Sequence, residues 1–110
     1  MPEKMVLIYT TFPDAETANS VGEALVREKL AACVNVHAPM TSLYEWQGEL
    51  TKESEVAAIV KTRASLADAA IAFARARHPY TVPCFLVLPV ESANEDYLAW
   101  LLSQTKSSAS

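Results

Sequence analysis

The sequence predicts an α+β fold in which strands and helices follow one another in the order βαββαβ, with an extra helix near the C-terminal end. Apolar, strand-like stretches at residues 5–11 and 82–90 lie near the two ends of this pattern. Two amphipathic helical stretches follow the first and precede the last of these strands, and shorter strand-like stretches fill the middle. This order is that of a ferredoxin-like sandwich, in which helices cover one face of a sheet.

The first part of the chain is expected to hold a strand, a helix and a second strand. Residues 5–11 are apolar on both faces, which is typical of a buried strand. Asp14 is a good N-cap for the helix that follows, and the basic residues Arg27 and Lys29 suit its C-terminal end. Residues 32–36 predict the second strand.

The middle of the chain predicts a strand pair and a second helix. Residues 42–46 and 55–62 are the two strands, and Gly48 lies in their connection, where a turn or bulge needs a positive φ. Ser65, with Asp68 three residues later, resembles a capping box at the start of the helix.

The last part of the chain predicts one more strand and one more helix. The second helix ends at His78, because a residue before proline avoids the α conformation. Residues 82–90 form the strand, Asn94 caps the final helix, and residues 106–110 are expected to be a frayed polar tail. We expect residues 1–110 to form a single domain.

Such a sheet would expose apolar side chains on its uncovered face. The first and last strands are apolar on both faces, and Tyr44 and Trp46 share one side of the central hairpin. A monomer in water rarely tolerates a large apolar patch, so we expect a closed homo-oligomer. The alternative is that all these residues lie in an internal core.

Composition narrows the possible functions. Hydrophobic residues make up 51% of the 110 residues, and charged residues 20%, as in an ordinary globular domain. The net charge of −4, without a cluster of Lys and Arg, argues against nucleic-acid and anionic-membrane partners. Only two glycines are present, too few for a glycine-rich phosphate loop. Two cysteines cannot build a disulfide framework, and charged Glu3 and Lys4 lie where a signal peptide would be apolar, so we expect a cytoplasmic location.

Seven short motifs occur in an order that resembles the CutA family of divalent-cation tolerance proteins, over about residues 5–102. They are 29–35 (KLAACVN), 42–48 (SLYEWQG), 55–56 (EV), 61–62 (KT), 78–80 (HPY), 82–83 (VP) and 97–100 (YLAW). The resemblance implies homotrimers of ferredoxin-like subunits whose long hairpins pair between neighbours. It also implies copper tolerance and divalent-metal binding in bacterial members, with no assigned reaction, and a trimer like that of the PII ligand sensors.

His78 and Cys33 are the predicted metal ligands. From spacing alone no short-range ligand pair exists: Cys33 and His37 share a strand face but lie about 13 Å apart, too far to hold one ion. The resemblance implies copper ligands at the positions of Thr10, Arg77 and His78, of which only His78 can still donate. A trimer could still gather symmetry-related groups.

The two cysteines have a second interpretation. Cys33 follows two alanines and could instead pack as a small apolar residue. Cys84 occupies a position where the resemblance implies a glutamate in many relatives. We expect it to be buried and inert, because no cationic neighbour in the sequence would lower the pKa of its thiol.

The resemblance places several polar-tipped aromatic and charged residues near subunit boundaries, where they predict a cleft between subunits. The alternative is that they form the subunit interface itself. They are Tyr44, Trp46, Lys61, Tyr80 and Trp100, with His78 nearby. No nucleophile has a base at a spacing that predicts catalysis, so no catalytic residue is expected.

Together with the expected oligomer, the resemblance therefore implies a homotrimeric divalent-cation tolerance protein. We expect it to associate with copies of itself and to bind a divalent metal ion such as copper. It is expected to contribute to the response to metal ions and to need no organic cofactor. The alternative is a PII-like small-ligand sensor or scaffold trimer without a dedicated metal site.

Overall fold

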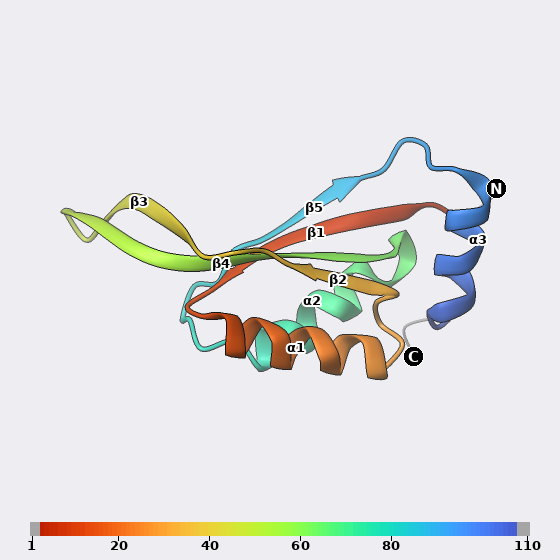
Figure 1. Cartoon of the computed structure of the whole chain (residues 1–110), viewed down its shortest axis with the longest axis horizontal. Coiled ribbons are helices and arrows are strands. Elements are labelled where there is room, and N and C mark those ends of the chain that lie inside the picture. Colours follow the sequence, from red (N-terminus) through yellow and green to blue (C-terminus); the bar gives the residue numbers. More distant parts are fainter. Residues whose placement is uncertain (1–2, 108–110) are drawn as a thin grey trace.

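A computed structural model describes residues 3–107 as an antiparallel sheet with two helices against one face (Figure 1). The sheet has the order β2-β4-β1-β5, and β3 pairs with the outer part of β4. The elements are β1 (Met5–Phe12), α1 (Ala15–Arg27), β2 (Cys33–Val36), β3 (Met40–Trp46), β4 (Glu49–Arg63), α2 (Ala67–Ala76), β5 (Phe85–Pro89) and α3 (Glu95–Gln104). This confirms the ferredoxin-like α+β fold with an extra C-terminal helix.

The core lies between the sheet and the helices α1 and α2. Alternate residues of β1, among them Ile8 and Phe12, point toward the helices and are almost fully buried. Leu25 of α1 and Leu66, just before α2, meet them from the other side. The inward-facing side chains of β1, which alternate along the strand, therefore pack against the apolar stripe of α1 in one layer.

The β3–β4 hairpin extends well beyond the body of the molecule, whose longest dimension is 47 Å (Figure 1). Gln47 and Gly48 form its two-residue turn with φ values of 51° and 83°, the pair of positive values that such a turn requires. The predicted turn at Gly48 is confirmed. The predicted start of the strand at residue 55 is wrong, because residues 49–54 also pair with β3 although no apolar alternation marks them as a strand.

The first helix cap is confirmed and the second is wrong. Asp14 accepts a hydrogen bond from the Thr17 backbone N–H at 2.8 Å. Ser65 lies inside a short 3₁₀ turn, and its hydroxyl donates to Glu3 Oε1 at 2.7 Å instead of capping α2. The helix α2 also ends at Ala76, two residues before the predicted end.

The last strand and helix differ from expectation in detail. The strand β5 begins at Phe85, three residues later than predicted, after Pro83, which has no backbone N–H to donate. Asn94 is the N-cap residue of α3, as predicted, but its side chain makes no capping hydrogen bond and donates to Asp96 Oδ1 at 2.6 Å.

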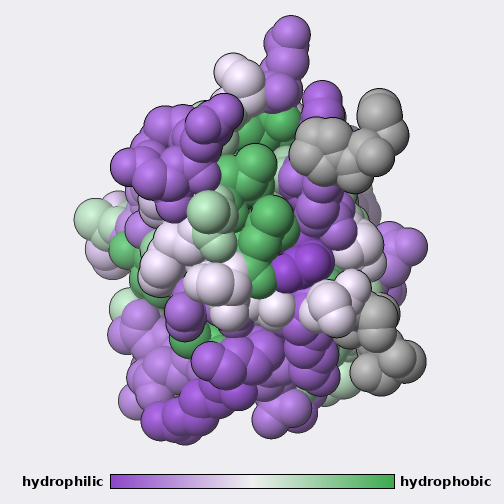
Figure 2. All heavy atoms as spheres, turned by 90° about the vertical axis from the view of Figure 1, so that its right-hand side faces the viewer, coloured by the Kyte–Doolittle hydropathy of each residue, from purple (hydrophilic) through white to green (hydrophobic). Residues whose placement is uncertain are grey.

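A buried arginine holds the C-terminal end of α3 against the sheet. Arg63 donates from Nε to Thr105 Oγ1 at 2.9 Å and from its terminal nitrogen to the Leu102 and Thr105 carbonyls. The Lys106 N–H donates to the Lys29 carbonyl at 2.9 Å, so the backbone at Lys106 is held, while residues 108–110 of the predicted tail lie outside the described residues. Figure 2 views this end of the molecule, where apolar side chains lie among polar ones.

The sheet face opposite α1 and α2 exposes apolar side chains, as the sequence predicted. Leu86 and Leu88 of β5 are 54% and 46% exposed, and they lie beside Tyr9 and Leu7 in the sheet register. The alternative of a wholly internal core is therefore wrong for these residues. Within residues 3–107, β5 is also an edge strand, since only β1 pairs with it. Pro83 lies two residues before β5, and Pro89 is its last residue.

Candidate functional site

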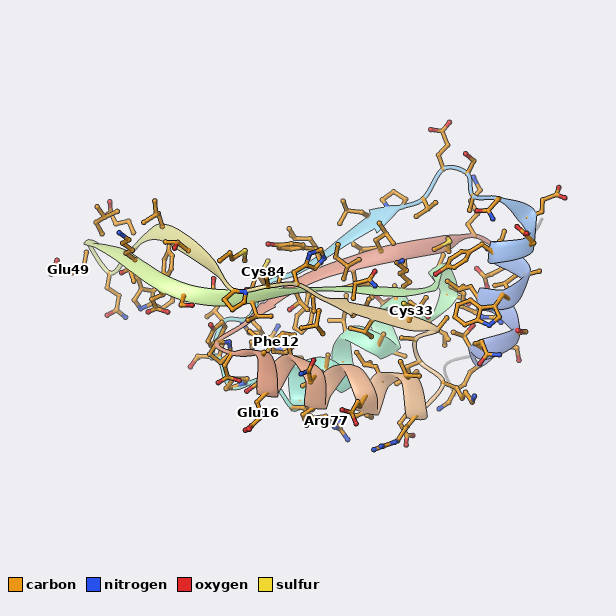
Figure 3. All side chains as sticks on the ribbon, viewed as in Figure 1. Phe12, Glu16, Cys33, Glu49, Arg77 and Cys84 are labelled. Atoms are coloured by element: carbon orange, nitrogen blue, oxygen red, sulfur yellow. The ribbon has the colours of Figure 1, made fainter. Side chains whose placement is uncertain are left out.

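A groove of about 520 Å³ lies where the β3–β4 hairpin leaves the body of the molecule. Its walls include three aromatic residues, two carboxylates and one thiol: Tyr44, Trp46, Tyr80, Glu53, Glu55 and Cys84. Figure 3 labels Cys84 near the base of the hairpin. The groove therefore lies between the hairpin and the segment that connects α2 to β5.

The strand geometry places the hairpin residues on one face. Tyr44 and Trp46 are two residues apart on β3, and Glu53 and Glu55 are two residues apart on β4. The register pairs Ser42 with Glu53, so both sets point to the same side of the hairpin. The alternation along the two strands thus brings aromatic and acidic side chains together.

The hydroxyl of Tyr80 donates a hydrogen bond to Glu55 Oε2 at 2.7 Å. Glu55 is buried, with 9% of its surface exposed. Burial, followed by this hydrogen bond and the negative charge of Glu55, raises the pKa of Tyr80 well above its ordinary value. Desolvation and the charge of Glu53 raise the pKa of Tyr44 in the same way. Both phenols therefore stay protonated at neutral pH.

His78, a predicted metal ligand, uses both ring nitrogens within the chain. Nε2 lies 2.7 Å from the Thr11 carbonyl oxygen, which can only accept, so we place the ring proton on Nε2. Nδ1 accepts a hydrogen bond from the Tyr80 N–H at 3.2 Å. The ring also stacks on Phe12, with the centroids 4.6 Å apart. In this arrangement neither nitrogen is free to bind a metal ion.

Cys33, the second predicted ligand, lies elsewhere on the sheet (Figure 3). It pairs with Lys61 on β4, whereas Thr11, next to His78, pairs with Ala57. Four residues of strand separate Lys61 from Ala57, which is about 13 Å. The structure does not bring Cys33 and His78 together, and residues 3–107 contain no group of three His, Cys, Asp or Glu side chains placed to hold a metal ion.

The other two positions of the implied copper set have structural contacts. Thr10 is 1% exposed, and its hydroxyl has no hydrogen-bond partner within the described chain. Arg77 stacks its guanidinium on the Phe73 ring at 3.5 Å and donates to the Phe73 carbonyl at 3.0 Å. Neither side chain offers a lone pair suited to copper.

The predicted cleft residues divide into two groups within one chain. Tyr44, Trp46 and Tyr80 line the groove. Lys61 lies with its Nζ 5.7 Å from the Tyr97 ring centroid, and that ring is 5.6 Å from the Trp100 ring, at the α3 end. Lys61 and Trp100 therefore belong to a separate cluster of side chains.

Glu53 and Cys84, which both line the groove, differ from what the sequence predicted. Glu53 was not predicted, although its spacing of two from Glu55 would have placed it on the face of Tyr44 had the strand been extended to residue 49. Cys84 is half-buried instead of fully buried. Burial and the charge of Glu55 raise the pKa of its thiol, which agrees with an unreactive cysteine.

Comparisons with known proteins place this chain in one family. The chain is 41% identical over 102 residues to the divalent-cation tolerance protein CutA of Pyrococcus horikoshii, covering 93% of this chain and 99% of that protein. It is 39% identical over 107 residues to the protein CutA of Mus musculus, covering 97% of this chain and 60% of that protein.

Solved structures agree with the sequence comparison. The crystal structure of the divalent ion tolerance protein CutA1 from Ehrlichia chaffeensis has a TM-score of 0.92 and 32% identity, covering 96% of this chain and 99% of that one. The sequence profile described as CutA1 divalent ion tolerance protein matches residues 6–104. Because this match spans nearly the whole chain, the chain belongs to the CutA1 family of divalent ion tolerance proteins.

Proposed function

We propose that this chain acts in divalent-cation tolerance as a homotrimer that binds a divalent metal ion such as copper. The observation that carries the proposal is the family match over residues 6–104. The Pyrococcus horikoshii relative, named for divalent-cation tolerance, is matched over 99% of its length. A role in the response to metal ions is thus the function that the family match supports best.

The exposed apolar face supports the trimer. Leu86 and Leu88 stand on the sheet face that α1 and α2 leave open, and the outer edge of β5 has free backbone groups within residues 3–107. A closed symmetric assembly would cover such a surface and satisfy such an edge.

We propose His78 and Cys33 as the metal ligands. An ion at His78 would displace either the Thr11 carbonyl or the Tyr80 N–H from the ring. Since Cys33 of the same chain lies far along the sheet, we propose that the ion is shared between subunits, where symmetry can supply further ligands.

Native mass spectrometry of the reduced protein, with and without one equivalent of copper per chain, tests this function. We expect three chains of 12.0 kDa together with bound copper. The variant His78→Gln should lose the copper, whereas His37→Gln, which changes an exposed histidine, should keep it. A trimer without copper would remove the metal from the proposal, and a monomer would remove the trimer.

A second candidate function is small-ligand sensing by the same assembly, without a dedicated metal site. The aromatic groove favours it, because small-ligand sites combine apolar walls with a few polar groups. If this function holds, Trp46→Ala should weaken binding of the small molecule, and Trp100→Ala should not. Equal binding by both variants would place the ligand outside the groove.

A further inference from the structure

Glu55 is a buried carboxylate without a cationic partner among residues 3–107. It is 9% exposed, and one of its oxygens accepts the Tyr80 hydroxyl. The ion pairs found between residues 3 and 107 join Arg27 to Glu23 and Arg63 to Glu3, and none includes Glu55. Buried charges are normally paired, because removing a charge from water costs several kcal/mol. The arrangement leaves a negative charge at the groove that a bound cation would neutralise.

The rest of the groove adds to this negative charge. Glu53 lines it beside Glu55, and no Lys or Arg of the described chain does. The pKa values of Tyr80 and Tyr44 are raised first by burial and then by these two carboxylates, and the pKa of Cys84 is raised by burial and then by Glu55. Each of these groups resists becoming an anion there, so the groove disfavours anionic ligands and favours cations.

The aromatic walls distinguish between kinds of cation. Tyr44, Trp46 and Tyr80 offer ring faces, which attract organic ammonium ions through their quadrupoles. A bare divalent metal ion prefers several oxygen, nitrogen or sulfur ligands, and indole supplies none. The volume of about 520 Å³ also suits a small organic molecule better than a single ion.

We propose that this groove binds a small organic ammonium ion, with Glu55 as its counter-charge and the side chains of Tyr44, Trp46 and Tyr80 around its alkyl groups. The inference rests on the second function proposed above, small-ligand sensing, and names the class of ligand. The copper experiment does not bear on it.

Tryptophan fluorescence with choline as the probe tests this inference. The experiment uses the Trp100→Phe variant, so that Trp46 in the groove is the only tryptophan. Choline should change the emission in a saturable way at low ionic strength. Its neutral isostere 3,3-dimethylbutan-1-ol, which has the same shape without the charge, should bind at least about tenfold more weakly.

Two matched variants locate the charge. Glu55→Gln keeps an acceptor for Tyr80 but removes the charge, and should weaken choline binding about tenfold or more. Glu45→Gln makes the same change on the opposite face of the hairpin, next to Tyr44 in sequence, and should leave choline binding unchanged.

Three results would overturn the inference. Equal binding of choline and the alcohol would leave small-ligand sensing standing but remove the organic cation. A response to zinc that needs Glu55, without a response to choline, would make the occupant a metal ion. No response to any probe in the intact assembly would mean that the groove is closed to small cations, for example by a second copy of the chain.

Discussion

Tyr80 and Glu55 are joined by a hydrogen bond of 2.7 Å between the phenol hydroxyl and Oε2. Tyr80 belongs to the segment after α2, and Glu55 lies on β4 at the point where the hairpin leaves the sheet. The bond therefore connects the two walls of the groove across 25 residues of sequence. It also gives a buried carboxylate its one hydrogen-bond donor within the described residues.

Replacing Tyr80 by phenylalanine should destabilise the protein. The change removes the donor and leaves the Glu55 oxygen buried without a partner, which costs about 1–3 kcal/mol. Urea unfolding at a fixed protein concentration measures the loss, since the stability of an assembly depends on concentration. Tyr9→Phe, on the open sheet face, is the control and should change stability by less. Equal losses in the two variants would show that the hydrogen bond contributes nothing.

Alkaline pH should weaken the fold through the same residue. The pKa values of Tyr80 and Cys84 are raised in the folded chain above their ordinary values of 10.0 and 9.0. The unfolded chain therefore releases these protons first, and the free energy of unfolding falls as the pH rises above about 9. Urea unfolding between pH 8 and 11 should show this fall, and Tyr80→Phe should make it shallower. A fall of the same steepness in both proteins would contradict the assignment to Tyr80.

Two buried threonines should respond in opposite directions to the same substitution. The hydroxyl of Thr10 has no hydrogen-bond partner within residues 3–107, so Thr10→Val should stabilise the fold by about 1 kcal/mol. The hydroxyl of Thr62 donates to the Leu30 carbonyl at 2.7 Å, so Thr62→Val should destabilise it by about 1–3 kcal/mol. Urea midpoints of both variants, measured together, check the pair. Destabilisation by Thr10→Val would mean that its hydroxyl has a partner in the assembly.

Local signals in the sequence predicted much of the fold. The two-sided apolar pattern of β1, the Asp14 cap and the glycine turn at Gly48 each depend on neighbouring residues, and each is found. The outer part of β4 was missed because its pairing with β3 depends on register and not on an apolar face. Ser65 failed as a cap because Glu3, distant in sequence, accepts its hydroxyl.

The candidate site could be predicted only in part. The spacing of two between Tyr44 and Trp46 placed them on one face, and both line one groove together with Tyr80, which was also predicted as a cleft residue. The contact of His78 with the Thr11 carbonyl spans 67 residues, so the sequence could not show that this ring is already occupied. The contact between Lys61 and Tyr97 could not be predicted either, because it depends on where α3 packs against the sheet.

The prolines at the outer edge of β5 limit how the molecule can grow by strand addition. An unpaired edge strand can pair with the edge strands of further molecules, and repeated pairing of this kind leads to fibrils. Pro83, two residues before β5, and Pro89, the last of its five residues, carry no N–H. Any strand that adds there finds a short ladder with closed ends. A second strand at this edge could form only a few ladder hydrogen bonds, so the edge is a poor starting point for an unlimited polymer.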